Sequence, residues 1–417
     1  MHHLPKTHLF KLDTMADQYL KRWIGLPRCA TTAVIHANTA MNIKKISSLF
    51  KETHCVSHTS TQLKGDKRVN ILLDNKIERE SKLVRMKTVT VEAEQIYQKA
   101  MSWNTVQGKL PNPEGALTTP DNFHLTNEII TPSVQFITDV KKDTKAAVNS
   151  DENEITFQHI QTLVKQGNIL KLTQIQQVDA TWKSYLYNLP KGTMKFLINA
   201  NIDTLPTNVN LTQWGKRSND LCSLQCGKRE TTNHLLNCCE VALPRFLWRH
   251  NNVLHYILTC LDTQKYSVFC DVSEKVTSAG GTIPPNICVT NLKPDLVIID
   301  KSSKTIKLFE LTVPGELRIE TAHKLKYDKY QHFESSITSH QTSVIPFEIG
   351  SHTGYISSGN KSSLSVLHKY CKKEIKSKKF NQNISAITVL GSFYIFKARK
   401  QLNWSEEAII SAPFSNQ

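Results

Sequence analysis

The sequence lacks any long apolar run. No stretch of its 417 residues approaches the roughly 20 apolar residues that a membrane-spanning helix needs. It also lacks an N-terminal segment that combines a basic flank, an apolar core and a small-residue cleavage site, so we expect no secretory signal. Both absences disfavour a membrane-spanning or secreted protein and predict an intracellular one.

Negative charge is scarce as well, and the imbalance predicts the class of partner. Asp and Glu number 36 against 52 Lys and Arg, which leaves a formal net charge of +16. Through counterion release, such an excess favours a polyanion, most simply nucleic acid. A basic protein without such a partner is the alternative that charge alone leaves open. The length allows two or three domains, each with its own core.

The cysteines are predicted to bind metal. Ten cysteines in a chain without an expected signal indicate reduced thiols rather than a disulfide framework. The segment CSLQCGKRETTNHLLNCC supplies Cys222, Cys226 and His234, followed by Cys238 or Cys239. Two thiols, an imidazole and a third thiol at this spacing fit a tetrahedral zinc site. A chance grouping of buried free cysteines is the alternative.

The N-terminal half is predicted to be helical. Within residues 1–65, apolar side chains recur at four-residue spacing from Met15 to Trp23, and Gly25 is expected to end that helix. Residues 66–180 are polar, with a Pro- and Gly-rich stretch that predicts a loop or linker. In that region we expect helices over 91–101 and 156–164 and the loop at 109–122.

Two basic helices are expected further on. The segment LPRFLWRHNNVLHYIL carries Arg245, Arg249 and His250 beside the cysteine cluster, which predicts a nucleic-acid contact where an isolated helix would only have a solvated basic face. The segment LHKYCKKEIKSKK is expected to place four lysines on one helical face, opposite its apolar residues, for electrostatic contact with DNA. These are Lys369, Lys372, Lys373 and Lys376.

From about residue 271 the pattern changes to short β-rich runs. Together with a periodic helix, these runs predict an α/β or α+β domain over residues 261–405. The expected strands are 286–290, 295–300, 305–313, 343–350 and 386–396, and the expected helix is 316–337.

Two carboxylates lie in runs that otherwise read as buried strands. If residues 301–304 form a four-residue hairpin loop, Asp300 faces Thr305 and Asp295 faces Glu310. That register puts the side chains of the last pair about 5 Å apart on one face. Two like charges this close are costly unless one is protonated or a cation such as Mg²⁺ lies between them. A slip of one residue would separate the acids.

The lysine of such a site is expected on a helix. Many metal-dependent nucleases carry a lysine two residues after the second acid, but here that position is Thr312. On the expected helix 316–337, Lys326 and Lys329 complete the apolar stripe that should face the sheet. A lysine there is costly unless it snorkels or meets carboxylates, so we predict that at least one of them reaches the acid pair. A strand-edge acid pair with snorkelling lysines is the alternative.

Together these segments resemble the region downstream of the reverse transcriptase in non-LTR (LINE-type) retrotransposon polyproteins that carry a restriction-enzyme-like endonuclease. No Tyr-x-Asp-Asp polymerase motif occurs in the sequence. The stretches that carry the resemblance are DQYLKRWIGLPRCATTAVIH, MKFLINANIDTLPTNVNLTQWGK, the cysteine-histidine segment, WRHNNVL, GGTIPPNICVTNLKPDLVIID, LFELTVPGELRIETAHKLKYDKY and FEIGSHTGYIS.

The resemblance implies an α+β multidomain chain with a helical N-terminal half, a small zinc knuckle and a C-terminal PD-(D/E)xK restriction-endonuclease-like α/β domain. The implied segments are a thumb-like segment at 1–65, a polar region at 66–180, the zinc knuckle with its basic helix at 181–260, and the endonuclease at 261–405. By position, the zinc ligands would be Cys222, Cys226, His234 and Cys239, and the catalytic and Mg²⁺-binding residues Asp295 and Glu310, with Lys326 and Lys329 as the helix lysines.

The resemblance also implies an activity. It is Mg²⁺-dependent nicking of target DNA in the nucleus, so that the new 3′ end primes reverse transcription, with DNA and also RNA as partners. The spacing of the first two cysteines and the use of Glu at position 310 depart from the commoner family pattern. A catalytically inactive nucleic-acid-binding remnant is the alternative, and a protein-interaction scaffold with structural zinc is a third.

Overall fold

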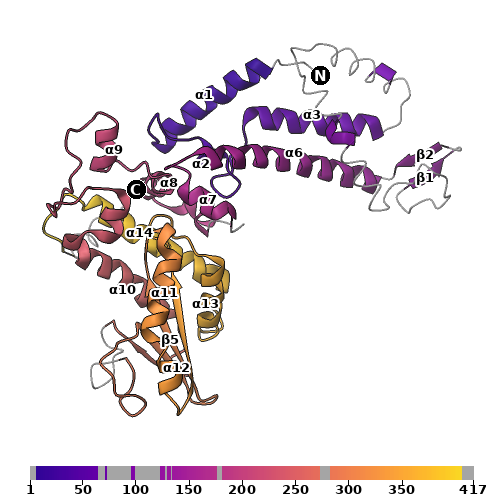
Figure 1. The fold of residues 1–417 in the computed structure, drawn as a ribbon. Helices are drawn as coiled ribbons and strands as arrows, with labels where there is room; N and C mark the ends of the chain where they lie inside the picture. Colours follow the sequence, from indigo (N-terminus) through magenta and orange to yellow (C-terminus); the bar gives the residue numbers. More distant parts are fainter. Residues whose placement is uncertain are drawn as a thin grey trace. The chain divides into compact units, whose positions relative to one another are not determined.

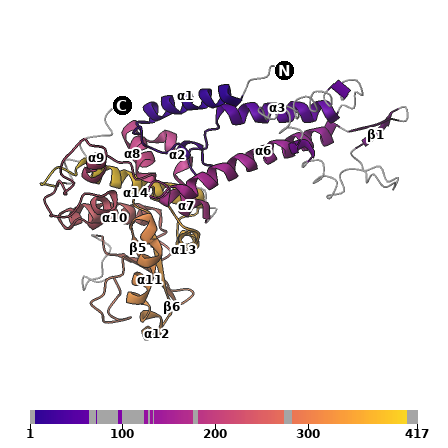
Figure 2. The ribbon, with the colours of Figure 1, turned by 45° about the horizontal axis from the view of Figure 1, so that its top comes forward.

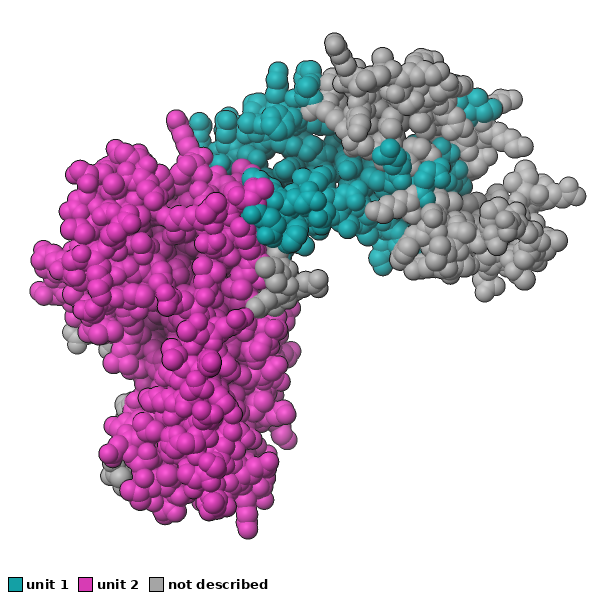
Figure 3. All heavy atoms as spheres, viewed as in Figure 1, with its two compact units in different colours: residues 1–23, 35–161 teal, residues 24–34, 162–417 magenta. Residues whose placement is uncertain are grey.

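The computed structural model describes residues 6–63, 71–72, 95–98, 123–126, 129–132, 134–175, 181–272 and 282–405 (Figure 1). The chain divides into two compact units, one of residues 1–23 and 35–161, the other of residues 24–34 and 162–417 (Figure 3). The fold is mostly helical α+β with a four-stranded mixed sheet in the second unit. No helix of the described residues is long and apolar enough to cross a membrane.

The first unit is built from long helices. These are α1 (Lys6–Ile24), α3 (Ile46–Leu63) and α6 (Val134–Thr162), with a short hairpin of β1 (Phe123–Thr126) and β2 (Ile129–Pro132). The predicted end of the first helix is confirmed, because Gly25 follows α1 with a φ of +78° that glycine adopts most readily. The apolar side chains of Met15 and Trp23 are more than half exposed on α1. Residues 156–162 of the predicted helix 156–164 are the end of the longer α6, and the expected loop at 109–122 lies outside the described residues.

The second unit contains the sheet, whose strand order is β3–β4–β5–β6. Strands β3 (Ser267–Cys270), β4 (Leu296–Asp300) and β5 (Thr305–Thr312) are antiparallel neighbours, and β6 (Gln341–Glu348) runs parallel to β5. The predicted hairpin is confirmed, since Asp300 pairs with Thr305 and Leu296 with Phe309. One step beyond that last pair, Asp295 comes opposite Glu310.

Helices cover both faces of this sheet. Alternate residues such as Leu296, Phe309 and Phe347 join a core with α10 (Leu243–Cys260), α13 (Ser358–His368) and α14 (Ser377–Lys397). The intervening residues, such as Val297 and Leu308, pack against α11 (Ile319–Tyr330) and α12 (Phe333–Ser336). Figure 2 shows α10 and α14 lying side by side, and the two helices pack together. By the period-2 alternation of strands, Asp295, Glu310 and Glu348 belong to the α11 face.

Three expectations about this unit are wrong. Residues 386–396 form part of helix α14, because their apolar side chains are buried against α8, α10 and α13 rather than on two faces of a sheet. Residues 286–290 form no strand, and the neighbour of β4 at the edge of the sheet is β3. The predicted helix 316–337 is divided into η6 (Glu316–Arg318), α11 and α12.

The remaining short elements precede the sheet in the sequence or connect the helices. They are α2 (Ala33–His36), α7 (Asn168–Ile175), η1 (Thr181–Ser184), η2 (Leu186–Asn188), α8 (Lys191–Asn201), α9 (Asn208–Gln213), the π-helical turn η3 (His234–Cys238) and η4 (Glu240–Ala242).

Candidate metal centre and acidic site

Three thiols and an imidazole converge in the cysteine-rich segment. The ligand atoms of Cys222, Cys226, His234 and Cys239 all lie within 4.8 Å of one another. The Cys222 and Cys239 sulfurs are 3.8 Å apart, and the Cys226 sulfur is 3.2 Å from His234 Nε2. Two thiolates bound about 2.3 Å from a tetrahedral ion lie roughly 3.8 Å apart, so this cluster fits zinc.

The structure distinguishes Cys239 from the adjacent Cys238. Cys239 is buried in the cluster, whereas Cys238 is exposed and its sulfur accepts a hydrogen bond from Asn233 Nδ2. Turn η3 separates His234 from Cys239, and the hydroxyl of Thr231 accepts from the backbone N–H of His234 at its start. The fourth member of the cluster is therefore Cys239.

The turn that carries the first two cysteines is held by a buried acid. Glu230 is fully buried and accepts hydrogen bonds from the backbone N–H groups of Asn208 and Ser223. The Cys222 N–H donates to the carbonyl of Lys228, which closes the loop between the cysteines. These bonds fix the loop without using any of the cysteine sulfur atoms.

The thiols of the cluster hold protons that a metal ion would have to displace. Burial raises the pKa of Cys222 to about 12 and also raises the pKa of Cys239. Burial would also raise the pKa of Cys226, but the backbone N–H of Lys228 and the neighbouring thiols outweigh it and lower that pKa. Burial lowers the pKa of His234, which keeps the imidazole neutral. Zinc binding would therefore release protons from at least two thiols.

The two strand acids meet at the end of the hairpin. Glu310 is wholly buried and Asp295 is only 8 % exposed. The backbone N–H of Asp295 donates to Glu310 Oε1 at 3.0 Å, and the N–H of Leu311 donates to Asp295 Oδ2 at 2.8 Å. Glu310 thus accepts from the backbone of Asp295, and Asp295 accepts from the backbone of the residue after Glu310, which holds the two carboxylates close together.

One of the two predicted lysines reaches this pair. Lys326 Nζ lies 2.7 Å from Glu310 Oε2, so the expected contact between a helix lysine and the acids is confirmed for Lys326. Lys329 is exposed, and its Nζ donates to the Tyr330 hydroxyl at 2.8 Å. The expectation that Lys329 faces the sheet is wrong, because the neighbouring Tyr330 occupies the buried stripe at the end of α11.

A histidine from α10 completes the contacts of Asp295. His250 Nε2 lies 3.2 Å from Asp295 Oδ2, and the imidazole is half-buried. Although burial opposes protonation, the hydrogen bond and charge of Asp295 outweigh it and raise the pKa of His250. His250 therefore points to the acid pair, whereas its sequence context predicts a nucleic-acid contact beside the cysteine cluster.

The pKa values of the two acids are shifted in opposite directions. Burial and the neighbouring Asp295 raise the pKa of Glu310 to about 7. Burial would raise the pKa of Asp295 too, but His250 and Lys326 outweigh it and lower that pKa. One negative charge is thus held on Asp295, while Glu310 binds a proton more readily than an exposed carboxyl would.

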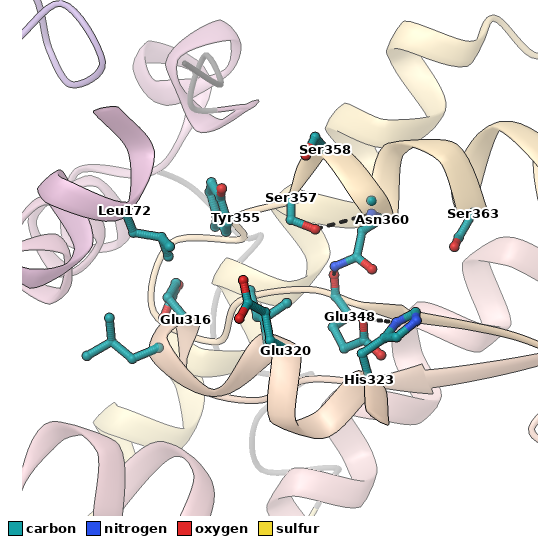
Figure 4. Close-up of a pocket in the computed structure, with 13 residues that line it drawn as sticks. Leu172, Glu316, Glu320, His323, Glu348, Tyr355, Ser357, Ser358, Asn360 and Ser363 are labelled. Atoms are coloured by element: carbon teal, nitrogen blue, oxygen red, sulfur yellow. Dashed lines mark hydrogen bonds and ion pairs between the residues drawn. The ribbon is translucent and has the colours of Figure 1, made fainter. Parts of the chain in front are cut away.

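A third carboxylate that the sequence patterns missed lies on the same face. Glu348 is fully buried at the end of β6, opposite Thr312, and its Oε2 is 3.1 Å from His323 Nδ1 (Figure 4). Within the described residues, Glu348 Oε1 and the Thr312 hydroxyl are buried without a hydrogen-bond partner. Glu348 and His323 line a 570 Å³ cavity at the N-terminus of α13. Once β6 is paired parallel to β5, the period-2 alternation places Glu348 on the same face as Glu310, and this pattern could have identified it.

Both arginines of α10 are buried, so neither offers the exposed guanidinium that the predicted nucleic-acid contact needs, and neither lies on a solvated basic face. Arg249 donates to Ser392 Oγ at 2.9 Å, to Val313 O at 3.1 Å and to Asn237 Oδ1 at 3.3 Å. Arg245 donates to the carbonyls of Ala398 and Gln401. Their guanidinium groups join α10 to α14 and to the strand ends instead of facing solvent, because a planar group with five donors can satisfy several carbonyls at once.

The four lysines expected on one helical face lie in a connection. Helix α13 ends at His368, and the chain then pairs with Leu261 through Cys371 before α14 begins. The expected helical face is therefore wrong, since tertiary pairing interrupts the helix. All four side chains remain exposed in or next to this connection: Lys369, Lys372, Lys373 and Lys376.

No protein-family model matches the chain, and no curated protein matches it in sequence. What the structure supports without relatives is a Cys₃His cluster consistent with zinc binding. The buried acid pair with its lysine is a second, separate cluster on the sheet.

Proposed function

We propose that this protein is a Mg²⁺-dependent DNA endonuclease. The observation that carries the proposal is the contact of Lys326 with Glu310, which itself binds the backbone of Asp295. Two carboxylates and one lysine at the end of a strand hairpin are the groups that phosphodiester hydrolysis needs. They lie on one face of the sheet, beside a cleft that Lys326 and His250 line.

The donor set fits a hard cation. Asp295 and Glu310 offer carboxylate oxygens, the ligands that Mg²⁺ prefers, and Asp295 Oδ1 accepts no hydrogen bond from a described residue. When bound, Mg²⁺ would polarise the scissile phosphate and acidify a water. Lys326 would orient the attacking water and offset the charge that develops on the phosphate. His250 would hold Asp295 in place through its Nε2.

The wider role follows from the resemblance of the sequence to non-LTR retrotransposon endonucleases. In that role the chain would nick target DNA for priming of reverse transcription in the nucleus, with a restriction-endonuclease-like domain as its catalytic part. The zinc module and the exposed lysines after α13 would hold DNA or RNA through phosphates. The net charge of +16 supports a polyanion partner.

A plasmid nicking assay tests the proposal. Supercoiled DNA should relax to open circles with the wild-type protein and Mg²⁺, but not with EDTA and not with Asp295→Ala. Asp300→Ala is the matched control, because Asp300 lies at the other end of the same strand in an exposed turn. DNA binding without any Mg²⁺-dependent nicking would favour the catalytically inactive remnant instead.

A further inference from the structure

A cleft opens beside the acid pair. Its volume is 620 Å³, within the range of pockets that hold small molecules or single groups of larger ones. Lys326, His250 and Thr312 line one part of it. Since Lys326 and His250 also contact Glu310 and Asp295, an occupant of the cleft would lie next to the site of proposed hydrolysis.

The other walls of the cleft are apolar. Leu243 and Leu247 lie one turn apart on α10, line the cleft, and are each 59 % exposed. Phe246 adds a half-buried ring, over which the guanidinium carbon of Arg249 lies 5.7 Å from the centroid. The cleft therefore combines an apolar wall, open to solvent, with cationic groups at one side.

We propose that this cleft receives one unstacked nucleobase of the DNA strand, adjacent to the phosphate that is cleaved. The inference rests on the proposed function and names its substrate more closely: DNA with a locally unpaired base. A nucleobase is an apolar plate covalently tied to an anion, so it matches leucine walls that end at Lys326. The exposed leucines supply the apolar contact that replaces stacking in the duplex.

A nucleobase can occupy the cleft only if the DNA is locally unpaired. A base inside a duplex must be unpaired and unstacked before it enters the cleft, which costs a few kcal/mol. An unpaired or mismatched base has lost most of that stabilisation already. The protein should therefore prefer DNA that contains a short bubble over the same sequence fully paired.

The test uses two oligonucleotide duplexes that differ only in a central unpaired segment. Binding is measured in Ca²⁺ by filter retention, and nicking in Mg²⁺ by denaturing gels. The wild type should bind and nick the bubble about tenfold better than the paired duplex, with cuts beside the unpaired bases. The double variant Leu243→Ala/Leu247→Ala should lose most of that preference. Leu325→Ala is the control, because Leu325 is 66 % exposed on α11 but does not line the cleft.

Each result decides between specific alternatives. Equal binding of both duplexes by the wild type overturns the inference, and so does a bubble preference that survives the double leucine variant. A leucine-dependent bubble preference in Ca²⁺ without nicking in Mg²⁺ keeps the base site and refutes the endonuclease. Unchanged DNA affinity of every variant would assign the cleft to another ligand, such as a peptide, and overturn the inference.

Discussion

Replacing Lys326 gives the sharpest test of the acidic site. Its Nζ lies 2.7 Å from an oxygen of the wholly buried Glu310, and its side chain is 29 % exposed. A hydrogen bond to a buried charged group contributes about 1.5–3 kcal/mol to stability. In Lys326→Ala the pKa of Glu310 should rise further, so the carboxyl would bind a proton at neutral pH. This protonation limits the loss in the free energy of unfolding to about that range and removes the anion that Mg²⁺ needs.

The effects on rate and on binding should differ widely. Loss of one group that stabilises the developing charge lowers a rate by about 10²–10³-fold. DNA affinity should change less than about twofold, since one cation among many contributes little to phosphate binding. Nicking is followed on plasmid under saturating Mg²⁺, affinity by filter retention, and stability by urea unfolding.

Two neighbouring lysines provide the controls for this experiment. Lys324→Ala removes an exposed charge from the same helix, and Lys329→Ala removes a charge that contacts Tyr330 rather than an acid. We expect both variants to nick within a few-fold of the wild type. A folded Lys326→Ala protein that nicks at the wild-type rate would refute the assignment of Lys326, and the inactive-remnant function would then be favoured.

Four further predictions concern metal, pH and salt. The protein should bind about one zinc per chain, and metal analysis should show its loss in Cys226→Ser and His234→Ala but not in Cys238→Ser; full zinc in His234→Ala would contradict the ligand set. Because the pKa of Glu310 is raised to about 7, the Mg²⁺ concentration for half-maximal nicking should fall as pH rises from about 6 to 8. Because of the same shift, Glu310 binds protons more tightly in the folded metal-free protein than in the unfolded chain. The free energy of unfolding, measured in titrations, should therefore fall as pH rises from 4.5 through about 7. The exposed lysines after α13 are Lys369, Lys372, Lys373 and Lys376. Neutralising all four should weaken DNA binding and flatten its salt dependence in filter-binding titrations. An unchanged slope would show that these residues are only solvated.

The parts of the site that follow from local pattern could be predicted. The hairpin register depends on a polar turn and on the period-2 alternation, which together place Asp295 opposite Glu310. The zinc ligands lie within one short segment, so their spacing alone indicates the cluster. The contact of Lys326 with the acid pair could be predicted because a charged side chain on an apolar stripe needs a partner.

The parts that depend on tertiary packing could not be predicted in the same way. Helix α14 has the apolar run of a buried strand because helices surround it, and periodicity does not distinguish the two cases. Arg249 is buried because carbonyls of distant segments surround its guanidinium, which no local pattern encodes. Glu348 joins the acidic face only through the parallel pairing of β6 with β5, and that pairing spans a crossover through α11 and α12.

The three bonds of Arg249 have a consequence for how this protein can be divided. Through Asn237, Arg249 is bonded to the turn that carries a zinc ligand, and Asn237 Nδ2 also donates to Ser351 Oγ at 2.9 Å. Through Val313, Arg249 is bonded to the chain just after the strand of Glu310. A fragment cut at the start of the sheet would leave these carbonyl and hydroxyl groups buried without their donor. Recombination or engineering that exchanges the sheet between chains would therefore have to carry turn η3 and α10 with it.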